Sequence, residues 1–203
     1  MGDKEIPLRL IEIGGGKLYF LKPISDDVRL FQAIFSNYKK TKKLMLVAMF
    51  ACIASILQAA GGFLPGIGFF ISPFATAPIL FIAMLSLPFG GMSYFLTIML
   101  LFILEPTELI VFPFTTGLLG LGIGAAFHIF RKRISIVAAG AVLLTSGIMS
   151  LLFILGFPIL GPVSADSITF LATGSILLFT FLYSWLWVEI ILHIFKRIKR
   201  IML

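Results

Sequence analysis

The side chains that could carry out chemistry in this chain are few and lie at opposite ends of apolar segments. The two histidines, His128 and His193, fall at basic ends, whereas Glu105, Glu108 and Asp166 fall in loops at the other ends. The hydrocarbon core of a bilayer is about 30 Å thick. Because a nucleophile, a base and an orienting acid must lie within hydrogen-bond reach, these groups cannot form a catalytic triad. We therefore expect no catalytic residues and interpret the chain as a protein that is not an enzyme.

Metal and cofactor sites are equally hard to build from this sequence. Cys52 is the only cysteine, and with two histidines the chain offers few ligands for zinc. The glycines of residues 117–124 resemble a phosphate-binding loop, but they lie inside an apolar segment and follow no strand. Gly120 and Gly124 are instead spaced for close helix packing in lipid. We expect no metal and no cofactor, and the chain has no Walker motif.

The composition requires a bilayer as the main solvent. Of the 203 residues, 60% are hydrophobic and 12% are charged, against about 25% charged in a typical soluble domain. The mean hydropathy is +1.12. The net charge of +7 comes from Lys and Arg that flank apolar segments. No surface of alternating basic and aromatic residues accompanies this charge, so we do not expect nucleic acid as a partner.

The distribution of basic residues predicts the topology. All 16 Lys and Arg residues fall on one side of six apolar segments, which the positive-inside rule assigns to the cytoplasm. Only an even number of spans brings both basic termini and the 131–133 loop to that side. The sequence therefore predicts an all-α, multi-pass protein of the cell membrane with six transmembrane helices and cytoplasmic termini. The spans cover about residues 44–60, 71–87, 92–104, 109–130, 134–155 and 168–195.

Three regions follow from this division: a polar cytoplasmic segment at 1–43, the six-helix domain at 44–195 and a basic cytoplasmic tail at 196–203. Within the first region, residues 6–21 have the pattern of a hairpin around a glycine turn. Residues 26–38 have the pattern of an amphipathic helix that could lie on the membrane surface.

Several local features refine the spans. The third span is roughly 13 residues long, where a full crossing needs about 17–25, so it could be tilted or re-entrant. Residues 88–91 predict a tight turn, and residues 61–68 predict a loop rich in helix breakers. The aromatic residues near the cytoplasmic end of the last span predict an interfacial belt; they are Tyr183, Trp185 and Trp187.

A weak threefold repeat marks the spans that run from outside to inside. The repeat is Phe or Leu, then a small or hydroxyl residue, then threonine, and its threonines are Thr76, Thr116 and Thr173. All three are expected at a similar depth in the outer third of the membrane. Their hydroxyls could line a pocket that opens to the outside. The alternative is that these threonines pack helices and bond their own backbone carbonyls.

The outer loops carry acids and no bases. Glu105, Glu108 and Asp166 could border a ligand site, together with Gln58 at the outer end of the first span. An anionic ligand would find no counter-charge there, so a neutral or cationic ligand is favoured. The alternative is that the acids are solvated loop charges.

The first span carries a stripe of small residues, which allows another helix to approach closely in lipid. This stripe is either a docking face for a partner subunit or a packing face within the chain. Its members are Ala48, Ala51, Cys52 and Ser55.

These features together resemble the substrate-binding S components of energy-coupling factor (ECF) vitamin transporters, over about residues 44–195. The small-residue stripe resembles the family's docking pattern, residues 78–91 resemble its second span and glycine turn, and residues 117–124 resemble its glycine-rich fourth span. The resemblance implies a subunit that captures a vitamin-sized ligand from outside. It further implies docking on a transmembrane coupling subunit served by two cytoplasmic ATPases.

Two other interpretations remain open. Small six-span proteins of similar layout include membrane subunits of bacterial cell-shape machinery, of the rod-shape protein D type, which act as scaffolds and bind protein partners. A membrane protein without a ligand is the third possibility. Of the three, we favour the substrate-binding subunit of an uptake transporter, which captures a small neutral or cationic ligand from outside.

Overall fold

All regular elements in the described part of the chain are helices. The computed structural model describes residues 26–64, 66–154, 156 and 170–202. The elements are α2 (Asp26–Ser36), α3 (Lys40–Phe63), α4 (Gly68–Ile71), the 3-10 helix η1 (Ser72–Ala75), α5 (Thr76–Leu85), α6 (Leu87–Leu104), α7 (Glu108–Phe114), α8 (Thr116–Ile129), α9 (Arg133–Phe153) and α10 (Phe170–Met202).

Six helical stretches among the described residues are long and apolar enough to cross a membrane, which confirms the predicted all-α, six-span class. They are Lys40–Phe63, Gly68–Leu85, Leu87–Leu104, Glu108–Ile129, Arg133–Phe153 and Thr173–Ile198. The predicted hairpin at residues 6–21 lies outside the described residues.

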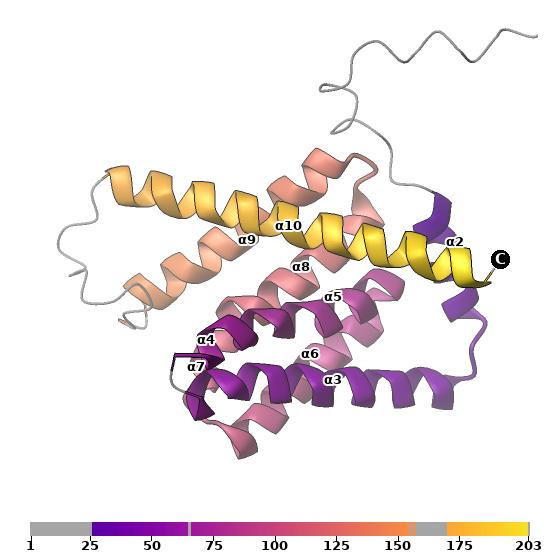
Figure 1. Ribbon diagram of the computed structural model, residues 1–203, viewed down its shortest axis with the longest axis horizontal. Helices are drawn as coiled ribbons and strands as arrows, with labels where there is room; N and C mark the ends of the chain where they lie inside the picture. Colours follow the sequence, from indigo (N-terminus) through magenta and orange to yellow (C-terminus); the bar gives the residue numbers. More distant parts are fainter. Residues whose placement is uncertain (1–25, 65, 155, 157–169, 203) are drawn as a thin grey trace, which may run out of the picture.

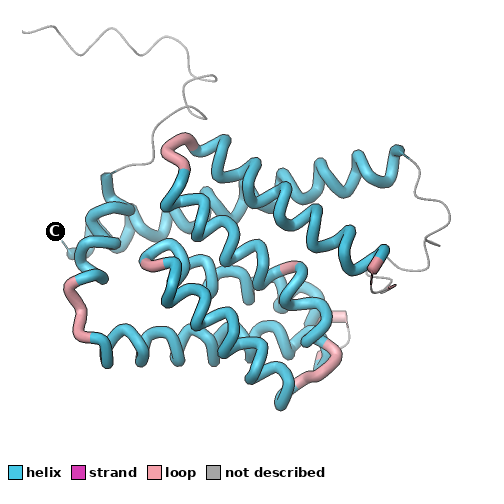
Figure 2. The backbone as a smooth tube through the Cα atoms, turned by 180° about the vertical axis from the view of Figure 1, so that it is seen from behind, coloured by secondary structure: helices cyan, strands magenta, loops and turns pink. Residues whose placement is uncertain are grey.

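The helices form one bundle in which neighbours follow the order α10, α9, α8, α5, α6 and α3. The α9–α10 pair lies on one side of the central α5–α8 pair, and α3 and α6 lie on the other (Figure 1). The same arrangement seen from behind shows the connecting loops gathered at the two ends (Figure 2). We call the end that holds residues 39–43, 131–133 and 196–200 the basic end. The opposite end, which holds Glu105 and Glu108, is the acidic end.

Glycines allow the central helices to approach one another closely. A Cβ atom at Gly120 would lie 2.8 Å from the Thr76 carbonyl oxygen on α5. A Cβ at Gly124, or at Gly90 on α6, would collide with Ala83. Ala83 is therefore held between the glycines of two helices, as small residues hold helices together in lipid. The predicted packing role of Gly120 and Gly124 is confirmed.

The predicted turn at residues 88–91 is wrong, and so is the short third span. The helix α6 has 18 residues and begins at Leu87, with Pro88 in its first turn. Proline is favoured there because its fixed φ suits the helix and the first N–H groups have no helical partner anyway. The break is limited to Ser86, which is extended (φ −159°, ψ 119°). Gly90 is required for the contact with Ala83 rather than for a turn.

The predicted breaker-rich loop at 61–68 is also shorter than expected. Helix α3 continues through Gly61 and Gly62 to Phe63, and the next helix begins at Gly68. Glycine lowers helix propensity by about 1 kcal/mol relative to alanine. At Gly61 and Gly62, this cost is outweighed by close contact with neighbouring side chains, which a Cβ atom would prevent.

Helix α2 confirms the amphipathic helix predicted after residue 25, but it packs against the bundle. Its buried side chains face the basic ends of α5 and α10, with the ring centroids of Phe31 and Phe195 4.9 Å apart. The Gln32 amide nitrogen donates to the Met84 carbonyl at 2.8 Å and lies 3.4 Å from His128 Nδ1. His128 Nε2 is 2.9 Å from the Ala83 carbonyl, so Nε2 carries the proton.

The Ala83 contact gives a stability test with an adjacent control. We expect Gly90→Ala to lower the apparent Tm in detergent by about 3–10 °C, because overpacking of this kind costs about 1–3 kcal/mol. Gly91→Ala should leave the Tm unchanged or raise it slightly, because a Cβ at Gly91 meets nothing within 4 Å. Scans at one fixed heating rate compare the two variants. Equal Tm values would contradict the packing described here.

The two ends of the bundle give a test of orientation. In a Cys52→Ser background, Thr107→Cys places the only thiol at the acidic end and Lys132→Cys places it at the basic end; both positions are exposed. The positive-inside rule predicts that a membrane-impermeant maleimide labels only the Thr107→Cys variant in intact cells. Labelling of both variants after the membrane is opened is the control, and the reverse pattern in intact cells would invert the topology.

Candidate functional site at the acidic end

Two of the six spans are broken helices, and both breaks face the same half of the bundle. The second span consists of α4, η1 and α5, with the 3-10 turn carrying Pro73. The fourth span consists of α7 and α8, which are separated at Thr115 (φ −119°, ψ −99°), two residues after Pro113. Discontinuous helices free backbone groups that a bilayer cannot satisfy, so such breaks need protein partners.

Two tyrosine hydroxyls provide these partners. The Tyr183 hydroxyl on α10 donates to the Pro73 carbonyl at 3.2 Å, and the Tyr94 hydroxyl on α6 donates to the Pro113 carbonyl at 3.1 Å. Neither role was predicted from the sequence. A signal for the breaks was present, however, because both occur in a Pro-Phe-x-Thr pattern, at residues 73–76 and 113–116.

Three of the predicted ligand residues form one hydrogen-bonded chain. The Gln58 amide nitrogen donates to Glu108 Oε2, and the Thr116 hydroxyl donates to Gln58 Oε1, both at 2.7 Å. These side chains come from α3, α7 and α8, and Gln58 is 1% exposed. Burying an amide without partners would cost several kcal/mol. Here both ends of the amide are satisfied, so the chain joins the half-helix α7 to its two neighbours.

Two carboxylates lie directly against the end of α3. A Cβ at Gly61 would collide with the Glu108 carboxylate, and a Cβ at Gly62 would lie 2.6 Å from the carboxyl carbon of Glu105. Because Gly61 and Gly62 have no side chains, the two carboxylates lie directly against the helix backbone. The Thr107 hydroxyl also donates to Glu105 Oε1.

The electrostatics of the two acids differ. Glu108 begins α7, where the partial positive charge of a helix N-terminus favours a carboxylate. Glu105 follows the last residue of α6 and lies at the end of α3, so it sits near two negative helix termini. No Lys or Arg of the described ranges lies at this end. The site is consequently suited to a positive charge.

A second polar group lies near the middle of the bundle. Thr76 on α5 and Trp187 on α10 are 0% and 4% exposed, yet Thr76 Oγ1 and Trp187 Nε1 make no hydrogen bond of ordinary geometry. The Tyr183 side chain lies near both. An unsatisfied buried donor costs about 1–3 kcal/mol. The two donors lie beside the Tyr183 side chain in a closely packed part of the bundle.

The threonine repeat has a different role from the predicted open pocket. Thr76 and Thr116 are packed between helices, at 0% and 9% exposure. Both follow a helix break, where small residues allow α5 and α8 to lie in close contact. Thr173 is half-buried near the start of α10, and none of the described hydrogen bonds joins it to the other two. Asp166 lies outside the described residues.

The predicted aromatic belt is also corrected in part. Trp187 is buried, with its ring centroid 6.1 Å from that of Phe74 in an edge-on contact. Tyr183 is committed to the Pro73 carbonyl. Only Trp185 is exposed enough, at 36%, to act as an interfacial residue. The internal pair is used for packing because it faces the broken second span.

The small-residue stripe on α3 divides between the inside and the outside of the bundle. Ala51 and Ser55 are 0% and 1% exposed, and the Thr97 hydroxyl on α6 approaches the Ala51 carbonyl at 3.4 Å. These two residues pack α3 against α6, so their predicted role in docking a partner is corrected. Ala48 and Cys52 are exposed.

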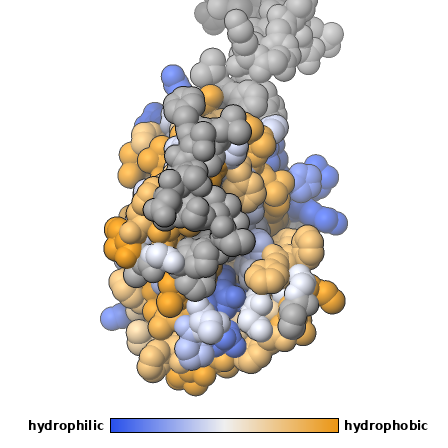
Figure 3. Space-filling model, turned by 90° about the vertical axis from the view of Figure 1, so that its left-hand side faces the viewer, coloured by the Kyte–Doolittle hydropathy of each residue, from blue (hydrophilic) through white to orange (hydrophobic). Residues whose placement is uncertain are grey.

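The surface of the acidic end carries both apolar and hydrophilic residues. Viewed from that end, apolar residues cover the flanks, and hydrophilic residues show in the lower part of the face between them (Figure 3). Hydrophilic side chains are thus open to water in that part of the face (Figure 3).

Comparisons with protein-family models, with curated proteins and with solved structures find no match for this chain.

The hydrogen-bonded chain can be tested by a double-mutant cycle. Thr116→Val and Gln58→Leu should each lower stability, because each leaves a buried polar partner unsatisfied. The double variant should lose less than the sum, with a coupling of about 0.6–1.7 kcal/mol. Thr97→Val is the control. Its hydroxyl bonds only backbone carbonyls, so its effect should add to that of Gln58→Leu. Additivity for Thr116→Val would contradict the chain.

Proposed function

We propose that this chain is the substrate-binding subunit of an uptake transporter in the cell membrane. It captures a small neutral or cationic ligand at the acidic end and passes it on through a transmembrane coupling subunit with cytoplasmic ATPases. The observation that carries the proposal is the pair of carboxylates, Glu105 and Glu108, held on Gly61 and Gly62 beside a buried amide and hydroxyl.

The charge of the ligand follows from the surroundings of the two acids. The negative ends of α3 and α6 oppose the Glu105 carboxylate, and the nearest donors are uncharged. A ligand with an ammonium or similar cation would supply the missing positive charge. Within the neutral-or-cationic class, the arrangement therefore favours a cation.

Docking on the coupling subunit would use the exposed members of the small-residue stripe. Ala48 and Cys52 lie one helical turn apart on the lipid-facing side of α3. Small side chains there allow a partner helix to come close to the α3 backbone. The scaffold function is the second candidate, and the same exposed stripe is the observation that favours it.

The proposal is tested on the purified full-length protein. Small amines and quaternary ammonium compounds are compared with carboxylates of the same size by the rise in Tm that they produce. We expect saturable stabilisation by the cations, because a ligand that binds only the folded state raises its stability. Glu108→Gln should weaken this binding at least about tenfold, since it removes a charged partner. Asp27→Asn, which removes a negative charge from helix α2, should not.

Native mass spectrometry of the same protein separates the alternatives. A bound vitamin-sized molecule that is lost in the Glu108→Gln variant supports the transporter function. A stoichiometric protein partner that co-purifies without any small molecule supports the scaffold function. Equal stabilisation by carboxylates and amines would contradict a cation site at the acidic end.

A further inference from the structure

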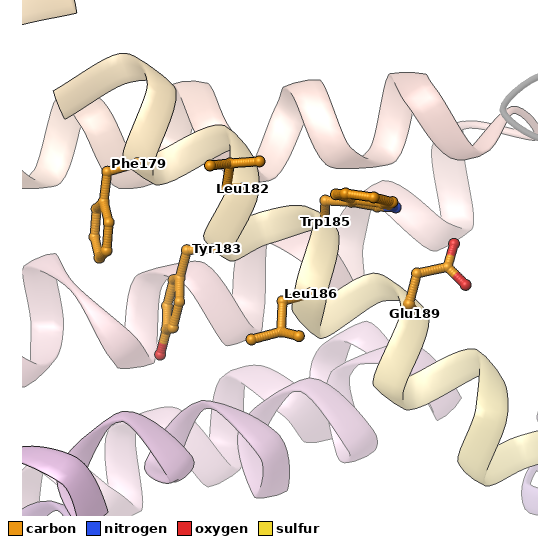
Figure 4. A pocket seen from close by; sticks show the side chains of 6 residues that line it. All are labelled: Phe179, Leu182, Tyr183, Trp185, Leu186 and Glu189. Carbon is orange, nitrogen blue, oxygen red and sulfur yellow. The ribbon is translucent and has the colours of Figure 1, made fainter. Parts of the chain in front are cut away.

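An open groove on α10 runs along the outside of the bundle, separate from the acidic end. It has a volume of about 480 Å³ and is lined by Phe179, Leu182, Tyr183, Trp185, Leu186 and Glu189. All six side chains stand on α10, and Phe179 and Tyr183 point to the same side of this helix (Figure 4). Phe179, Leu182 and Leu186 are 58%, 49% and 53% exposed, so the groove faces the lipid.

The groove covers the central part of the α10 span. Phe179 and Glu189 are ten residues apart, which corresponds to about 15 Å along a helix. This is half of the roughly 30 Å hydrocarbon core. Thr173–Ile198 is the candidate span in α10, and the groove lies across the middle of that span.

A second cavity continues the groove at the basic end. Its volume is about 380 Å³, and its lining includes Glu189, His193 and Lys196. These three residues are spaced i, i+4 and i+7 and therefore share a face of α10. His193 and Lys196 are exposed. Arg133 Nη1 lies 3.2 Å from Glu189 Oε1, so the acid between the two cavities is already matched by a base.

We propose that this surface binds one anionic phospholipid of the basic-end leaflet. An acyl chain would run from the second cavity into the apolar groove, along Leu186 and Leu182. The phosphate would lie beside Lys196 and His193, in the second cavity. An anionic lipid is favoured because a zwitterionic headgroup would bring its own cation next to Lys196. Basic pockets at the cytoplasmic ends of spans also favour anionic headgroups.

The experiment is a lipid titration of the delipidated full-length protein, followed by native mass spectrometry. Phosphatidylglycerol should bind in preference to phosphatidylcholine with the same acyl chains. Lys196→Ala should lower the affinity for phosphatidylglycerol about fivefold, as expected for one basic residue at a membrane surface, and leave phosphatidylcholine unchanged. Lys132→Ala, which removes the same charge at the same end but does not line either cavity, should have no effect.

A second variant tests the groove itself. Leu182→Trp places a larger side chain in the acyl cavity and should reduce the binding of both lipids, while Tm stays within a few degrees because Leu182 is about half exposed. Equal binding of the two lipids, an equal effect of Lys132→Ala, or competition by soluble glycerol phosphate would each overturn the proposal. None of these results bears on the cation site at the acidic end, so the two proposals fail separately.

Discussion

Every backbone N–H and C=O group within the bilayer must find a partner in the protein, and this requirement governs the architecture of the chain. The second and fourth spans are both broken next to a proline, and at each break the proline carbonyl accepts a hydrogen bond from another helix. Tyr183 and Tyr94 satisfy the carbonyls of Pro73 and Pro113. Because these tyrosines stand on α10 and α6, the two breaks also fix the helices on either side of the central pair. These two hydrogen bonds therefore supply polar partners at the breaks and also hold the broken spans against α10 and α6.

The separation of charge along the bundle gives its two ends different chemistry. At the basic end, Arg133 and Glu189 form an ion pair. Gln32 on α2 donates to the Met84 carbonyl, and His128 on α8 lies 2.9 Å from the Ala83 carbonyl. At the acidic end, Glu105 has only the Thr107 hydroxyl among the described hydrogen bonds. The Glu189 carboxylate at the basic end is therefore matched by a base, whereas the Glu105 carboxylate at the acidic end has no Lys or Arg of the described ranges beside it.

Most of the fold was predictable, because span length and charge asymmetry act through strong and local rules. The errors fell where tertiary contact reverses a local preference. Residues 88–91 have turn composition, but Pro88 suits a helix start and Gly90 is needed for the contact with Ala83. For the site, Gln58, Glu108 and Thr116 were predicted as members, since polar groups at the end of a span are unusual. Their mutual bonding, and the burial of Ala51, depend on which helices are neighbours, and the sequence alone does not determine that.

The position of the polar groups bears on the choice between a transporter subunit and a scaffold. A scaffold needs its recognition groups on the surface, whereas Gln58 and Thr76 are at most 1% exposed. Helix packing alone accounts for Gln58, because its two hydrogen bonds join three helices. Glu105 differs, because its carboxylate rests on Gly62 near the ends of α3 and α6 and its one described side-chain hydrogen bond comes from the neutral Thr107 hydroxyl. The cation proposed above would supply a positive charge that the described residues at this end do not provide.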